Sequence, residues 1–221
     1  MTNQKRSFMP HAKRMRPGIF HALAILFLTT CHPAHAAEPT KLFDEKTFTG
    51  WEGNLSAFRI EDGAIVGGSL KERVPQNEFL CTTREYADFE LRVTFKMVGE
   101  DPNAGIQFRT KRIPDHHEVS GYQADMGQQY WGALYDESRR NKILAGPDAE
   151  TIAKIVKKND WNEYVIRAEG NHIQLWLNGA KTVDYTETDD AIARTGVIAL
   201  QIHSGPPTEA WYKNITIKEL K

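Results

Sequence analysis

Apolar and polar residues alternate along most of the chain beyond residue 56. Within residues 89–98, five apolar side chains alternate with four charged or hydroxylated ones, which is the pattern of a strand with one buried face. Asn178-Gly179 separates two further runs and is typical of a type I′ hairpin turn. Other strand-like runs cover residues 58–60, 64–66, 105–110, 173–177, 180–185, 196–203 and 211–220. The pattern predicts an all-β fold, an antiparallel β-sandwich or jelly roll.

Two segments depart from this pattern. Residues 148–157 show a weak helical period, which predicts one short amphipathic helix. Residues 127–145 are aromatic and rich in Arg and Asp where a strand would be monotonous, so we expect a long irregular insertion there. Such insertions usually carry function in a compact β domain. Because the chain shows no internal repeat or linker, we expect a single domain over residues 37–221.

The N-terminus has the composition of a secretory signal peptide. Five basic residues and no acid precede an apolar run at 18–30, and Ala34-His35-Ala36 follows. We expect cleavage after Ala36, a signal peptide over residues 1–36, and a periplasmic or secreted mature protein. The apolar run is short for a membrane span, which needs about 20 residues. One alternative is that the segment is retained as a membrane anchor. The other is a lipoprotein attached through Cys31, although a Thr directly before the Cys fits a lipoprotein signal poorly.

Charge and cysteine content narrow the classes of function. Removing the five basic residues of the leader from 28 leaves 23 against 29 acidic residues, a net charge of about −6. This charge disfavours a nucleic-acid or anionic-membrane partner. The mature chain keeps only Cys81, so it forms no internal disulfide, and we expect this thiol to be buried as a small hydrophobe. The sequence has no nucleotide-binding loop and no serine hydrolase motif.

Three strand-like runs, at residues 105–110, 122–126 and 196–203, carry polar residues at alternate positions. If the strands adjoin, these side chains form a polar floor of the kind that hydrogen-bonds a hydroxylated ligand. The alternative is a solvated outer face, although such faces are usually built from Lys, Glu and Thr. The residues are Gln107 and Arg109, Gln123 and Asp125, and Gln201 and His203.

A second candidate group lies in residues 131–141, which hold two acids, two arginines and two aromatic residues. Trp131 and Tyr135 could stack on a sugar ring, Arg140 could grip oxygen atoms, and Glu137 could serve as an acid or base. The alternative is a surface loop held by its own ion pairs. No spacing of ligands demands a metal, although His203, Asp125 and Glu137 could supply a divalent metal site, so no cofactor is predicted with certainty.

The ordered set of motifs resembles the bacterial 3-keto-disaccharide hydrolase domain family over residues 41–220. The resemblance implies a concanavalin A-like jelly roll, export from the cytoplasm, and action on glycosides oxidised at C3. Many members carry Gly-Tyr-Glu where this chain has Gly121-Tyr122-Gln123, with the acid two positions later at Asp125. The motifs are Leu42-Phe43-Asp44, Gly50-Trp51, 58–63, 88–91, 104–109, 121–125, 131–141, 161–164, 177–179, 201–205 and Asn214-Ile215.

The chemistry implied by the resemblance needs a base at C2, a stabiliser for an enolate oxygen, and an acid at the leaving oxygen. On this basis the base is Asp125 or His203, the stabiliser is Arg109 and the acid is Glu137. Substrate positioning falls to Gln123, Gln201, Trp131, Tyr135 and Arg140. The partner is then an oxidised oligosaccharide or glycoside. A lectin-like glycan-binding module on the same fold is the main alternative, and an ordinary glycosidase acting on unoxidised sugars is a weaker one.

Overall fold

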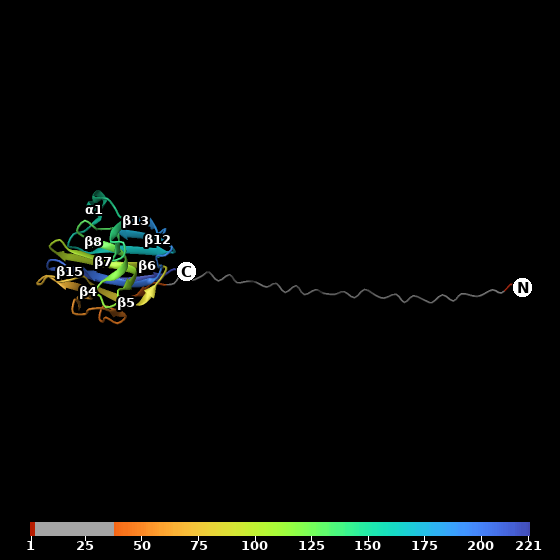
Figure 1. Ribbon diagram of the computed structural model, residues 1–221, viewed down its shortest axis with the longest axis horizontal. Coiled ribbons are helices and arrows are strands. Elements are labelled where there is room, and N and C mark those ends of the chain that lie inside the picture. The colour runs from red at the N-terminus through yellow and green to blue at the C-terminus, as the bar shows by residue number, and fades with distance from the viewer. Residues whose placement is uncertain (3–37) are drawn as a thin grey trace. The chain divides into compact units, whose positions relative to one another are not determined.

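The computed structural model describes residues 1–2 and 38–221, and residues 38–221 fold as one body (Figure 1). Apart from its first two residues, the predicted leader lies outside the described residues, as do its cleavage site and Cys31. Within the described part of the chain, no helix is long and apolar enough to cross a membrane.

Residues 38–221 form two antiparallel sheets packed face to face. The first sheet has the order β13 (Ala180–Thr186), β12 (His172–Leu177), β11 (Asn162–Glu169), β6 (Phe89–Gly99), β15 (Thr208–Glu219), β4 (Ala64–Ser69) and β3 (Phe58–Glu61), with β1 (Thr40–Lys41) paired to β15. The second sheet has the order β10 (Lys142–Ala145), β9 (Leu134–Glu137), β8 (Val119–Gly127), β7 (Asn103–Arg112), β14 (Gly196–Ile202), β5 (Glu78–Tyr86) and β2 (Trp51–Glu52). This arrangement confirms the predicted all-β sandwich of the jelly-roll class.

Alternation along the strands builds the core between the sheets. On β6, Phe89 and every second residue up to Met97 are buried, while the residues between them are partly or fully exposed. Apolar side chains from both sheets join in one main cluster. The β12–β13 turn has φ of 50° at Asn178 and 82° at Gly179, both left-handed as the predicted type I′ turn requires.

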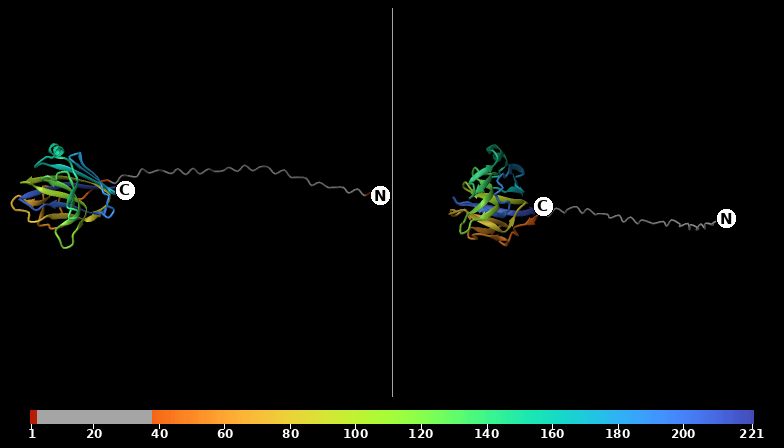
Figure 2. Two further views of the ribbon diagram at one scale, coloured as in Figure 1. Left: turned by 45° about the horizontal axis from the view of Figure 1, so that its top comes forward. Right: turned by 45° about the vertical axis from the view of Figure 1, so that its right-hand side comes forward.

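The segment predicted to be an irregular insertion is more regular than expected. Residues 134–137 and 142–145 pair as the β9–β10 hairpin, so the prediction of irregular structure over 127–145 is wrong for its second half. The sequence did not indicate these strands because charged residues interrupt the apolar pattern. The charged side chains pair with one another across the turn. Helix α1 (Ala149–Ile155) confirms the predicted helix, and the Asp148 side chain caps it by accepting a hydrogen bond from the Thr151 N–H. The helix lies at one end of the body in all three views (Figures 1 and 2).

The β7–β8 hairpin covers part of the outer face of the second sheet, the face turned away from the main core. Val119, at the start of β8, belongs to a small cluster with Phe79, Cys81 and Ala199 from β5 and β14. The Asn77 Nδ2 donates to the Glu118 side chain at 2.9 Å. As predicted, the Cys81 thiol is buried, and burial raises its pKa to about 11.

Candidate functional site

The outer face of the second sheet carries a row of buried polar side chains. Gln107, Gln123, Asp125 and Gln201 are each at most 3% exposed. Strand pairing sets Gln107 opposite Gln123 and Gly105 opposite Asp125. The structure therefore brings these four predicted residues onto one face, as the alternation predicts. The alternative of a solvated face is wrong for these residues, because all four side chains are buried.

Hydrogen bonds join three of these residues into a chain that ends at Asp125. Gln107 Nε2 donates to Gln123 Oε1 at 2.5 Å, and Gln123 Nε2 donates to Asp125 Oδ2 at 3.2 Å. The Thr110 hydroxyl donates to Gln107 Oε1 at the other end. The Met126 N–H donates to Asp125 Oδ1 at 2.9 Å. Each amide is thereby fixed in orientation, and the Asp125 carboxyl is held on both oxygen atoms.

A glycine makes room for this arrangement. Gly105 lies beside Asp125 on the neighbouring strand, and a Cβ atom at this position would collide with the side-chain carbon atoms of Gln123. The Gln123 side chain therefore lies directly over the Gly105 backbone and reaches Asp125. Alternation of polar and apolar residues carries no sign of this role for the glycine.

The pKa of Asp125 is raised well above its usual value. Burial is the largest cause, because the charged carboxylate loses its hydration, and the charge of Glu137 adds to it. The hydrogen bonds from Gln123 and Met126 oppose these effects only in part. Asp125 is therefore a carboxyl group that holds its proton at a pH where an exposed aspartate would be ionised.

Glu137, on β9, is the second carboxyl group of the site. It is half-buried, and burial is the main reason that its pKa is raised to about 7. The negative charge of Glu118 is the next cause, while the Ser138 N–H and the Gln201 amide lower the pKa. The Glu118 side chain is positioned by Asn77 and by the Ser138 hydroxyl. Glu118 is not among the residues that alternation or the motifs single out.

Gln201 is fully buried, and its amide nitrogen and oxygen make no hydrogen bond within the described part of the chain. Buried polar atoms nearly always have a partner, so two unpaired atoms on one side chain need an explanation. The amide influences the pKa of Glu137 and so lies near that carboxyl group. An amide beside a carboxyl group suits a ligand hydroxyl, which can donate to one and accept from the other.

His203 follows the last residue of β14, two positions beyond Gln201, and is half-buried. Its Nδ1 lies 2.7 Å from the Ser204 carbonyl oxygen. Because a carbonyl only accepts, Nδ1 carries a hydrogen, which leaves Nε2 as the nitrogen that can accept a proton. Tyr135, opposite Gln123 on β9, lies close enough to Glu137 for that charge to add to burial in raising the pKa of the tyrosine.

Arg109 does not face the site, so the prediction that it shares the polar face is wrong. Its φ of 48° lies in the left-handed region, at a break in the β7–β8 register that reverses the side-chain direction. The guanidinium donates to the carbonyl oxygens of Ala87 and Gly170 and to the Asp88 carboxylate at 2.7 Å. Arg109 therefore anchors loops at the end of the sandwich. Alternation could not indicate this position, because the β-bulge changes the direction of the side chain.

Arg140, which was predicted to position the substrate, is instead held in ion pairs away from the polar face. It pairs with the fully buried Asp136 and with Glu187, to which Nη2 donates at 2.7 Å. Glu187 in turn accepts a hydrogen bond from the Tyr122 hydroxyl at 2.6 Å. For this part of residues 131–141, the alternative of a loop held by its own ion pairs is the correct one.

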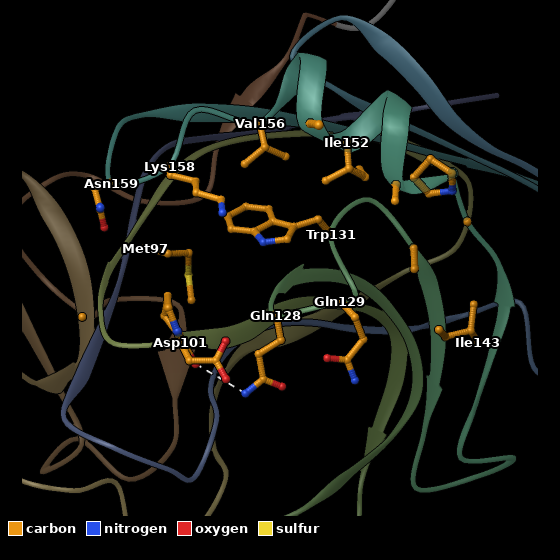
Figure 3. A pocket seen from close by; sticks show the side chains of 17 residues that line it. Met97, Asp101, Gln128, Gln129, Trp131, Ile143, Ile152, Val156, Lys158 and Asn159 are labelled. Carbon is orange, nitrogen blue, oxygen red and sulfur yellow. Dashed lines mark hydrogen bonds between the residues drawn. The ribbon is translucent and has the colours of Figure 1, made fainter.

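Trp131 is separated from the amide row as well. It is 9% exposed and packs in the main core, with its ring stacked on Phe95 at a centroid distance of 6.2 Å. It forms part of the wall of a pocket of about 880 Å³ beside helix α1 (Figure 3). Among the described residues, no three His, Cys, Asp or Glu side chains come together as a metal site requires, so His203, Asp125 and Glu137 do not form one.

A jelly roll with buried amides and two carboxyl groups of raised pKa on one face has the groups that can hydrogen-bond a hydroxylated ligand. More specifically, the chain belongs to the 3-keto-alpha-glucoside-1,2-lyase-like domain family, whose sequence model matches residues 38–218. The match confirms the family resemblance drawn from the motifs. Among curated proteins, none matches the chain.

Solved structures share the fold at low sequence identity. A candidate glycosyl hydrolase from Parabacteroides distasonis has a TM-score of 0.62 at 19% identity, over 83% of this chain and 94% of that one. A family 66 carbohydrate-binding module from Bacillus subtilis has a TM-score of 0.61 at 14% identity, over 77% and 96%. A galectin-like protein of unknown function from Bacillus subtilis has a TM-score of 0.60 at 11% identity, over 82% and 94%. At these identities the likeness concerns the fold.

Proposed function

We propose that this protein cleaves the glycosidic bond of 3-keto-glycosides, including 3-keto-disaccharides, by removal of the C2 proton, elimination and hydration. Membership of the lyase-like family supports this reaction. The observation that carries the proposal for this chain is the pairing of two carboxyl groups of raised pKa, Asp125 and Glu137, with the unpaired amide of Gln201 on one face.

The first step is proton removal. A ketone at C3 acidifies the C2 hydrogen, and the base takes it to form an enolate. We assign the base to Nε2 of His203, whose free electron pair is fixed by the bond from Nδ1 to Ser204. Asp125 is two strands across and two residues along from His203, because Gln201 is the residue opposite Gly105; at the usual strand dimensions this is about 12 Å between Cα atoms. A pyranose ring hydrogen-bonded on both sides bridges such a gap.

The enolate oxygen then needs a hydrogen-bond donor, and Arg109 is turned away from the site. Asp125 takes this role, because a buried carboxyl group that keeps its proton donates to a developing oxyanion. Glu137 gives its proton to the C1 oxygen as the C1–O bond breaks, leaving an enone. Water adds its oxygen at C1 with Glu137 as base, and C2 recovers a proton from His203.

Paired substitutions distinguish these roles. Asp125→Asn keeps a donor and retains most of the activity, whereas Asp125→Ala lowers kcat about 10²-fold or more, as loss of one oxyanion donor does. His203→Ala lowers kcat by about 10² or more, as loss of a general base does. Initial rates of monosaccharide release measure both effects. If Asp125→Asn were as impaired as Asp125→Ala, Asp125 would be the base and could not be the oxyanion donor.

The reaction itself is tested by incubating the purified protein with a 3-keto-disaccharide and, separately, with its unoxidised parent, with and without a chelator. Cleavage of the keto sugar alone supports the proposal, and cleavage of the parent indicates an ordinary glycosidase. Sugar binding without cleavage of either indicates a lectin-like module. Loss of activity with chelator identifies a metal requirement.

Export is a separate proposal. The basic, apolar and Ala34-His35-Ala36 regions of the N-terminus support a cleaved signal peptide and a periplasmic or secreted enzyme. N-terminal sequencing of the protein from the cell exterior or periplasm tests it, and a mature chain starting at Ala37 is expected. A lipid-modified Cys31 at the N-terminus would contradict it.

A further inference from the structure

A pocket of about 880 Å³ opens beside helix α1, and the proposed reaction does not use it. Trp131 and Met97 contribute apolar surface from the sandwich, and Ile152 and Val156 contribute it from α1 and the residue after it (Figure 3). The volume falls within the range of about 300–1,000 Å³ typical of small-molecule sites. An apolar cavity of this size suits a ligand with an apolar ring.

The pocket wall around Trp131 is rigid. Phe95 stacks on Trp131 and also on Tyr164, with centroids 5.3 Å apart in the second pair. The Tyr164 hydroxyl donates to the Asp125 carbonyl oxygen at 2.6 Å, which ties the stack to β8. Gly132, with φ of 77°, lets α1 approach, because a Cβ there would lie 3.1–3.2 Å from atoms of Pro147, Thr182 and Ile152. The ring of Trp131 is thus presented in a fixed position.

Polar groups also line the pocket. Asp101, Gln128 and Lys158 lie around it in Figure 3, and Gln128 Nε2 donates to the Asp101 carbonyl oxygen. An apolar wall with a few polar groups is the usual composition of a site that binds one end of a ligand and orients it.

The pocket adjoins the polar face through one short turn. Ala133 lines the pocket, and its carbonyl oxygen accepts a hydrogen bond from the Asp125 N–H at 2.9 Å. The Gly132 N–H donates to the Asp125 carbonyl at 3.2 Å. Ile143, another lining residue, pairs with Tyr135, which is itself opposite Gln123. A ligand bound over Asp125 therefore has the pocket next to it.

We propose that this pocket is an aglycone site that takes a flat apolar group, such as an aromatic ring, while the sugar lies on the polar face. The proposal rests on the proposed function for the place of the sugar. We therefore expect the protein to prefer glycosides with an apolar aglycone to glycosides whose aglycone is a second sugar.

Binding of unoxidised probes tests the site without any turnover. Calorimetry compares phenyl glucoside with methyl glucoside, both anomers of each, on the protein made from the full chain. We expect the phenyl compound of one anomer to bind at least tenfold more tightly than its methyl counterpart. Ala153→Phe places a ring into the pocket from an exposed lining position and should remove this difference.

Lys154→Phe is the matched control, because Lys154 is on the same helix but its side chain is 69% exposed. It should keep the tenfold difference, and thermal unfolding shows whether both variants fold. Equal affinity for phenyl and methyl glucosides, no binding of either, or an undiminished difference in Ala153→Phe would overturn the proposal. The outcome is independent of the proposed reaction, whose failure appears as absent cleavage of keto sugars.

Discussion

Glu137 links the charge state of the site to the rate of the proposed reaction. As the acid at the leaving oxygen it must carry a proton, and burial together with the charge of Glu118 sets its pKa at about 7. At pH 7 half of the molecules then carry a proton on Glu137, and at pH 9 about one molecule in a hundred does. Above the pKa, each pH unit lowers the protonated fraction about tenfold. We therefore predict that kcat/KM falls about a hundredfold along an alkaline limb with its midpoint near pH 7.

The assay is the initial rate of monosaccharide release from a 3-keto-disaccharide between pH 6.5 and 9.5, with the rate without enzyme subtracted. Glu118→Gln should move the midpoint to lower pH, because removing a neighbouring negative charge lowers the pKa of Glu137. Glu163→Gln, an exposed acid on the first sheet, should leave the midpoint unchanged. Glu137→Gln should lose at least about a hundredfold in rate together with the limb.

The same group predicts a change in stability. Its pKa is raised on folding, so the folded protein binds this proton more tightly, and stability falls as pH rises from 4.5 to about 7. A pKa change over that interval corresponds to about 3 kcal/mol of unfolding free energy. Because Glu137 is partly exposed to solvent, we expect a loss of only about 1 kcal/mol. Glu137→Gln should therefore unfold at a higher temperature than the natural protein at pH 8. An alkaline limb far from pH 7, or a Glu118→Gln midpoint that rises or stays, would refute the reasoning.

Two further substitutions separate structure from chemistry. Arg109→Ala should destabilise the protein by about 3 kcal/mol in denaturant unfolding, because it leaves Asp88 and two carbonyl groups without their buried partner. If the Arg109→Ala variant lost activity but kept its full stability, Arg109 would instead have a role in the site. Gly105→Ala should displace Gln123 and break its buried hydrogen bonds to Gln107 and Asp125, and so lower both the activity and the unfolding temperature. Unchanged kinetics would show that the Gln123 position is unimportant.

The fold was predictable where alternation is strong and turns are specific. Residues 89–98 and the Asn178-Gly179 turn indicated a strand and a hairpin because one buried face and two positive φ angles leave few alternatives. The β9–β10 hairpin was missed because Asp136 and Glu137 disrupt the apolar pattern. Asp136 is buried through ion pairs with arginines, and a periodic pattern of hydrophobicity does not register that kind of burial.

The candidate site was predictable only in part. Alternation brought Gln107, Gln123 and Gln201 together because a regular strand repeats every two residues. It misplaced Arg109, which lies in a bulge that shifts the repeat by one residue. Glu118 was missed because its approach to Glu137 depends on how the β7–β8 hairpin turns over the sheet, which local sequence does not encode.

The central claim is that cleavage passes through loss of the C2 proton, and solvent deuterium tests it most directly. A 3-keto-disaccharide is cleaved in D₂O, and the released keto sugar is analysed at early times against keto sugar kept in D₂O without enzyme. The account predicts one deuterium at C2 in each molecule of product from the earliest turnovers. Product that keeps its original C2 hydrogen, together with no primary isotope effect on cleavage of a substrate deuterated at C2, would contradict the account.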